Sequence, residues 1–262
     1  MRKHNVQTIT HNRILTPSLL GFDHMYLLIQ VLFVFVLGGL ANAQLNPTIN
    51  FAVSVCVMVA VSLILFGLYF RKENPNILTL MLLGIIVGQL ISNLSNFFIL
   101  MLDPTDFAFL QGSMFASFNN INSDLVYVSL APLLVVIALL FKLSRQLDVF
   151  WLDKDNAISL GVNVKKVTQR VLILVSVLIS ISTVLVGPIL FFGLLVANLT
   201  RQSLRSYRHK DLMIFSALIS IVMLLGGQWV VENVFSFETT ISVIINFVGG
   251  LYFLYLLVRQ KV

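Results

Sequence analysis

The feature that most constrains this sequence is a series of long apolar runs that follow one another along the whole chain. A helix needs about 20 apolar residues to cross a hydrocarbon core of roughly 30 Å. The 262 residues are 58% hydrophobic and only 11% charged, whereas soluble domains carry about 25% charged residues. The sequence therefore predicts an all-α, polytopic transmembrane helix bundle in which residues 1–262 form a single domain within the lipid bilayer.

The apolar runs between polar breaks predict about eight spans. These cover residues 24–41, 50–70, 77–102, 125–142, 171–186, 188–200, 212–231 and 240–258. Residues 171–200 can also be read as one long helix, but we expect a structural break at Gly187 and Pro188. Proline is well placed at the start of a helix, where its missing N–H would have had no partner.

The positive charges fall on one side of this layout. With eight spans, all 17 Lys and Arg residues lie in the termini or in loops on the same side. The loops on the other side carry only acidic charges, at Asp103, Asp106, Asp124, Glu232 and Glu238. Basic residues remain cytoplasmic, so we expect both termini in the cytoplasm. A single helix over 171–200 would place the basic cluster at 201–210 outside. Because sidedness explains the net charge of +6, no nucleic-acid partner is expected.

The third predicted span carries four polar side chains on one helical face. Gln89, Ser92, Asn93 and Asn96 are spaced i, i+3, i+4 and i+7, and residues at this spacing align along a helix. Polar groups that face lipid are costly. We therefore expect this face to turn toward other helices, with interhelical hydrogen bonds, or toward a water-filled substrate pathway.

The sequence contains no recognisable catalytic constellation. His4, His11, His24, His209 and the single Cys56 lack the spacing of metal ligands, and no P-loop is present. No Lys, Arg, Asp or Glu lies near the middle of a span, which argues against an ion-coupled carrier. We expect no catalytic residue, no metal site and no cofactor bound by this chain.

The longest cytoplasmic loop, residues 143–170, has a helix of its own in the predicted layout. Asp153 and Asp155 suit the first turn of a helix, because the helix dipole favours acids there. Gly161 suits the turn that follows a helix, so a short helix is expected over about 152–159. Such a loop is either a docking element for a cytoplasmic partner or a solvated connection.

Two segments resemble a known family. The stretch DNAISLGVNVKKV (155–167) is similar to the ATPase-coupling loop of the FecCD/BtuC-like family of ABC importer permeases, which serve iron–siderophore, haem and vitamin B12 transport. The segment GPILFFGLLVANLTR (187–201) is similar to the motif that follows that loop. Residues 7–22 and 237–260 resemble other parts of the family in the same order. The resemblance implies a fold of ten helices, of which the first two lack a counterpart here.

The resemblance implies the membrane-spanning permease subunit of an ATP-driven ABC importer, with an iron–siderophore as the expected substrate and the bacterial inner (plasma) membrane as the location. The implied partners are two ATPase subunits that bind ATP, a second permease subunit in a homo- or heterodimer, and an extracytoplasmic substrate-binding protein. The implied ATPase-coupling contacts are Asp155, Ala157, Leu160 and Gly161. The polar face of the third span would line the substrate pathway. A truncated or non-transporting scaffold subunit and an ion-coupled secondary carrier are the alternatives.

Overall fold

The computed structural model describes residues 21–39, 46–70, 77–119, 121–150, 154–204 and 206–259, and over these ranges the chain folds into helices without a β-strand. The all-α prediction is confirmed. The described helices are α1 (Phe22–Leu37), α3 (Pro47–Phe70), α4 (Ile77–Ile99), α5 (Pro104–Gln111), α6 (Ser123–Val149), α7 (Lys154–Ser159), α8 (Val164–Val186), α9 (Phe192–Ser203), α10 (His209–Asn233) and α11 (Ile241–Arg259).

All helices except α5 and α7 lie on the predicted spans, and they differ from the predictions mainly at their ends. α6 continues to Val149 and α8 begins at Val164, so both helices extend past the apolar runs. An apolar run marks only the part of a helix that lies in hydrocarbon, whereas backbone hydrogen bonding continues into water. α5 is a correction, because the predicted spans 77–102 and 125–142 leave no helix between them. Its start signals are Pro104 in the first turn and Asp106 beside it.

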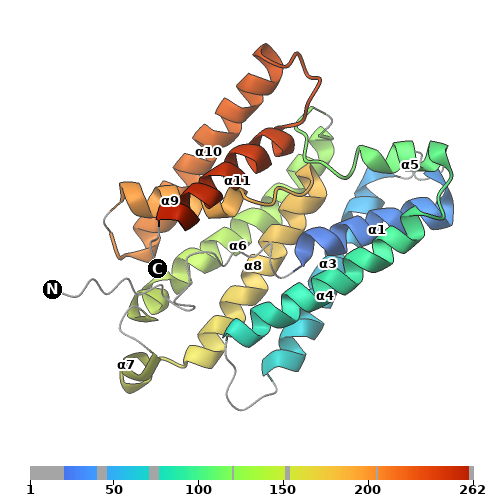
Figure 1. Ribbon diagram of the computed structural model, residues 1–262. Coiled ribbons are helices and arrows are strands. Elements are labelled where there is room, and N and C mark those ends of the chain that lie inside the picture. Colours follow the sequence, from blue (N-terminus) through green and yellow to red (C-terminus); the bar gives the residue numbers. More distant parts are fainter. Residues whose placement is uncertain are drawn as a thin grey trace.

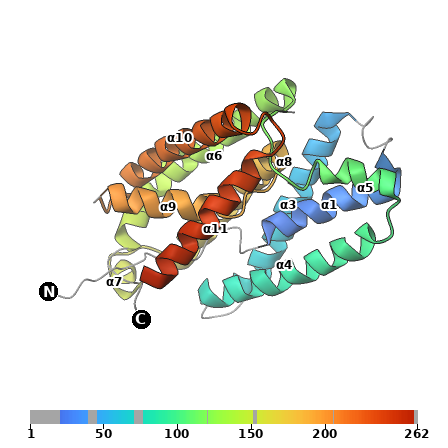
Figure 2. The same ribbon diagram turned by 45° about the horizontal axis from the view of Figure 1, so that its top comes forward.

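The helices form two groups that are joined by a central pair. α1, α3, α4 and α5 lie together, and α9, α10 and α11 form the other group (Figure 1 and Figure 2). α8 packs on α3 and α6, and α6 also contacts α10. α6 and α8 therefore connect the two groups.

Small polar side chains are buried on α3, α6 and α8. Ser54 on α3, Ser129 on α6, and Ser176 and Ser180 on α8 are fully buried. Ser129 and Ser176 donate hydrogen bonds to backbone carbonyls of their own helices, at 3.0 and 2.8 Å. A serine bonded in this way is compact and already has a partner, so neighbouring helix backbones can approach closely.

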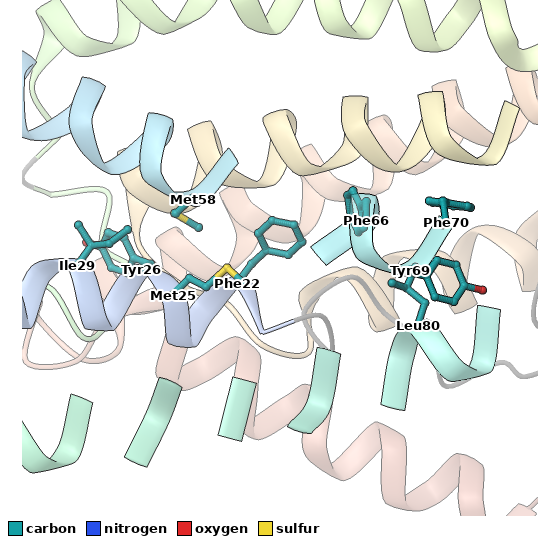
Figure 3. Close-up of a cluster of buried hydrophobic side chains, with 9 residues drawn as sticks. All are labelled: Phe22, Met25, Tyr26, Ile29, Met58, Phe66, Tyr69, Phe70 and Leu80. Atoms are coloured by element: carbon teal, nitrogen blue, oxygen red, sulfur yellow. The ribbon is translucent and has the colours of Figure 1, made fainter. Parts of the chain in front are cut away.

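Larger side chains fill the space between α1, α3 and α4 (Figure 3). The buried cluster consists of Phe22, Met25, Tyr26, Ile29, Met58, Phe66, Tyr69, Phe70 and Leu80. α1 and α4 meet at two glycines. A Cβ on Gly21 would lie 2.9 Å from the Cα of Gly88, so side chains are excluded at this crossing. Gly21 also has a φ of +82°, which favours glycine.

The surface of the bundle is largely apolar, whereas its interior contains polar side chains. Aliphatic side chains such as Val222 on α10, Leu225 on α10 and Ile86 on α4 are exposed, while the serines above are buried. This distribution is favourable only where lipid surrounds the protein. By length and composition, α3, residues 82–99 of α4, α6, α8 and α10 can each cross a membrane. The chain is a multi-pass membrane protein.

Polar contacts bring the predicted outer loops to one end of the bundle. The Gly39 N–H donates to Asp106 Oδ1 at 2.8 Å, and the Ser117 N–H donates to the Val186 carbonyl at 3.0 Å. The amide of Gln228, near the end of α10, donates to Asn119 Oδ1 at 2.9 Å. These contacts join segments that the charge pattern places on one side. The cytoplasmic location of the termini stays a prediction.

The sidedness predicts the labelling of two engineered cysteines in a chain that carries Cys56→Ala. In right-side-out membrane vesicles, a membrane-impermeant maleimide should label Glu238→Cys, which lies in the acidic outer loop. Ser203→Cys lies beside the basic cluster and should react only after permeabilisation, because translocating that cluster is unfavourable. Labelling of Ser203→Cys in sealed vesicles would contradict the layout. Both native side chains are exposed, so differences in burial would not explain the result.

Candidate functional site

The loop over residues 143–170 contains the predicted short helix. α7 ends at Ser159, and the Gly161 N–H donates to the Ile158 carbonyl at 2.9 Å while the Val162 N–H donates to the Ala157 carbonyl at 3.0 Å. These bonds use the last carbonyls of α7. Gly161 has a φ of +80°, a conformation that suits glycine at the end of a helix.

One side of α7 is buried and the other is open. Ala157 is 0% exposed. It packs with Leu147 on α6, with Phe150 directly after α6, and with Val167 on α8. In contrast, Leu160 is 62% exposed. Ala157 therefore seats α7 on the end of α6 and the start of α8, and Leu160 extends an apolar side chain away from that seat.

Some of the predicted coupling residues are therefore exposed and one is buried. Leu160 and Gly161 lie at the surface, together with Ile158 on the same turn. Ala157 faces inward, so its part in coupling would be to hold α7 in place and not to touch a partner. The side chain of Asp155 lies outside the described residues. The ATPase-coupling role of all four residues stays a prediction.

The predicted polar face on α4 is open. Gln89, Asn93 and Asn96 are exposed and Ser92 is partly buried. The Gln89 amide donates to Asn93 Oδ1 at 3.3 Å, a contact within α4 itself. The adjoining face of α4, which includes Gly84, Gly88 and Ser95, is buried. Within the described part of the chain, the polar face is therefore left uncovered, and its amides are available to a pathway or to another subunit.

The chain turns at Gly187 and Pro188, between α8 and α9. Gly187 has a φ of +104°, and a Cβ there would lie 2.7 Å from the Cα of Ala116. Its N–H donates to the Thr183 carbonyl at 2.8 Å, and the Leu190 N–H donates to Asn246 Oδ1 at 3.1 Å. The turn is therefore closely packed, and part of its backbone is hydrogen bonded.

α9 is too short to cross the bilayer alone. Its 12 residues span about 18 Å of the roughly 30 Å core. Leu194, Leu195, Val196, Asn198 and Thr200 are buried, and α9 lies against α10 and α11. Protein therefore covers much of the segment, as a short helix at membrane depth requires.

Sequence reasoning missed two carboxylates. Asp23 lies in the first turn of α1 and is buried, and its Oδ2 has no hydrogen-bond partner among the described residues. The predicted span began one residue later, at 24, so Asp23 was not considered an intramembrane group. Asp148 contacts His209 across 61 residues of sequence, and no local pattern indicates that pair.

Together, the apolar surface, the serine-lined interfaces and the covered short helix define a polytopic membrane protein. The profile of the FecCD transport family matches residues 5–259. The chain belongs to the FecCD transport family.

Several relatives are similar along almost the whole chain. The petrobactin import system permease protein YclO of Bacillus subtilis is 48% identical over 97% of this chain and 81% of its own length. The petrobactin import system permease protein FatC of Bacillus anthracis is 36% identical over 97% of this chain and 72% of its own length. A solved metal-chelate type ABC transporter in an inward-facing conformation shares the fold, with a TM-score of 0.84, 21% identity, and coverage of 97% of this chain and 79% of that chain.

Gly187→Ala is predicted to destabilise the protein. The methyl group would meet the backbone of Ala116, and a positive φ costs an alanine about 1–2 kcal/mol before any steric clash is counted. We expect the melting temperature of the purified protein in detergent to fall by several degrees. Gly193→Ala is the matched control, because its Cβ would meet nothing within 4 Å and it lies inside α9. Equal melting temperatures for the two variants would contradict this account of the turn.

Proposed function

We propose that this chain is the membrane-spanning permease subunit of an ATP-driven ABC importer that takes up an iron–siderophore complex. The observation that carries the proposal is α7, a short helix with a buried base and an exposed apolar tip, in a chain of the FecCD transport family. Two relatives named for petrobactin import support the substrate class. A petrobactin-like siderophore is the specific substrate that we propose.

The proposed location is the bacterial inner membrane, with the 143–170 loop in the cytoplasm. Two ATPase subunits would dock on α7 and hydrolyse ATP, so that this chain is not itself an enzyme. Closure of the ATPase pair would press on Ile158 and Leu160. Because Ala157 joins α7 to the ends of α6 and α8, the force would pass into the two helices that connect both groups of the bundle.

The proposed pathway follows the open face of α4. Gln89, Asn93 and Asn96 offer amide donors and acceptors without a formal charge. Such groups can exchange hydrogen bonds with the oxygen atoms of a passing chelate, and they lack the fixed charge that would hold it tightly. A second permease subunit would cover the rest of this face and complete the channel, and a substrate-binding protein would deliver the chelate from outside.

Deleting the gene is predicted to abolish growth on ferric petrobactin as the sole iron source. Uptake of labelled iron by energised vesicles should require ATP and should persist after ionophores collapse ion gradients. Uptake that survives ATP depletion but fails with ionophores would instead identify a secondary carrier.

Complementation with a Gln89→Leu, Asn93→Leu double variant should restore little uptake if these amides line the pathway. Wild-type uptake by that variant would remove the pathway assignment alone.

Leu160→Asp is predicted to uncouple transport, because it places a charge where an apolar contact with the ATPase is needed. Burying a large apolar side chain contributes about 2 kcal/mol, so we expect siderophore-stimulated ATP hydrolysis to fall by more than tenfold. Leu160→Met keeps an apolar side chain of similar volume and should remain close to the wild type. Normal stimulation in a correctly assembled Leu160→Asp complex would exclude α7 as the coupling element.

A further inference from the structure

The start of α10 is held by a side chain from another helix. Asp148 lies near the end of α6, and its Oδ1 accepts a hydrogen bond from the backbone N–H of His209 at 2.6 Å. The same oxygen lies 2.9 Å from Nδ1 of the His209 ring. An ionised carboxylate can only accept hydrogen bonds, so the ring nitrogen is the donor. One carboxylate thus binds both the backbone and the side chain of the first residue of α10.

Asp148 acts as the cap that α10 lacks in its own sequence. The first N–H groups of a helix have no acceptor within that helix, and the residue before α10, Arg208, makes no side-chain cap. A carboxylate in this place is also stabilised by the helix dipole. Ser206 shapes the preceding turn, because its hydroxyl accepts from the Arg208 N–H at 3.2 Å and donates to Asp211 at 3.1 Å.

The same end of α6 carries the seat of α7. Leu147 and Phe150, on either side of Asp148 in the sequence, pack in the buried cluster with Ala157 and Val167. Asp148 itself is part-buried and bonds to α10. A displacement of the α7 seat must therefore move Asp148, and with it the start of α10.

Apolar packing supplies the other contacts of α10. Val231, the one fully buried residue of this helix, packs in a cluster with Leu195 of α9 and with Ile241 and Ile245 of α11. Met223 and Leu224, in the middle of α10, pack against the same cluster. α6 and the residues beside it make polar contacts with α10 at both ends, through Asp148 and through Asn119, which accepts from Gln228. Movement of α10 would therefore be passed to α9 and α11 through this apolar cluster.

We infer that Asp148 is a positioning residue that transmits movement of the coupling helix α7 to α10 and, through α10, to α9 and α11. This inference rests on the proposed function. When the ATPase subunits press on α7, its seat and the end of α6 move together. The capped start of α10 follows, so the second group of helices changes position with the first.

The test uses the complete importer in proteoliposomes: this chain with its second permease subunit, ATPase subunits and petrobactin-loaded binding protein. The measured quantity is siderophore uptake per ATP hydrolysed, together with the amount of assembled complex. Asp148→Ala should lower uptake per ATP by about tenfold, the scale of one charge-assisted hydrogen bond. Asp148→Asn keeps an acceptor oxygen for the His209 N–H and should recover most of the loss.

Gln146→Ala is the matched control, because Gln146 is an exposed polar residue on the same turn of α6 and its loss should leave the ratio unchanged. If Asp148→Ala does not assemble, His209→Ala replaces it, since this variant removes the ring contact but keeps the backbone N–H. We then expect a smaller decrease, of about threefold. A wild-type ratio in the assembled variant would overturn the inference. Failure of the unaltered importer to couple uptake to ATP would instead overturn the proposed function.

Discussion

The structure depends on one constraint: backbone N–H and C=O groups within the hydrocarbon core must find their partners inside the protein, because lipid offers none. The helices satisfy most of their backbone groups by themselves. The places where a helix is interrupted, or is too short to cross the bilayer, are therefore the informative ones. At the Gly187–Pro188 turn, contacts from Thr183 and Asn246 supply the missing partners. The short α9 is tolerated because α10 and α11 cover it. Irregular backbone occurs at this depth only where neighbouring protein completes it.

The same constraint explains how the interior is packed. Apolar side chains gain little by leaving lipid for an apolar interior, so close contact and hydrogen bonding must hold the helices together. Buried serines on α3, α6 and α8 allow that close contact, and Gly21 against Gly88 allows it between α1 and α4. The two helices that join the halves of the molecule, α6 and α8, are also those on which α7 sits. The helices with the central packing and the seat of α7 are thus the same.

Sequence patterns predicted the helices well, because membrane crossing imposes a minimum apolar length and sidedness imposes a charge pattern. The charge pattern predicted the break at 187–188, which the end of α8 at Val186 confirms. The expected place of Pro188 at the start of a helix was wrong, because α9 begins only at Phe192. α5 was missed because it lies outside the apolar runs on which the prediction relied. The inward position of Ala157 also escaped prediction. A resemblance to a coupling loop identifies the segment, but which side of a six-residue helix is buried depends on how Leu147 and Val167, on the helices before and after it, pack against it after folding.

The polar face on α4 and the Asp148–His209 contact illustrate the opposite limits of sequence reasoning. The face repeats with the period of a helix, so the sequence alone reveals it, and within the described part of the chain it is left open. The capping contact has no period, because it joins two helix ends that meet only after folding. Its place gives it a consequence that a local pattern cannot have. Asp148 ties the start of α10 to the end of α6, while Val231, Met223 and Leu224 pack α10 against α9 and α11. In the proposed coupling, the start of α10 would follow the end of α6, and the apolar cluster would carry α9 and α11 with it.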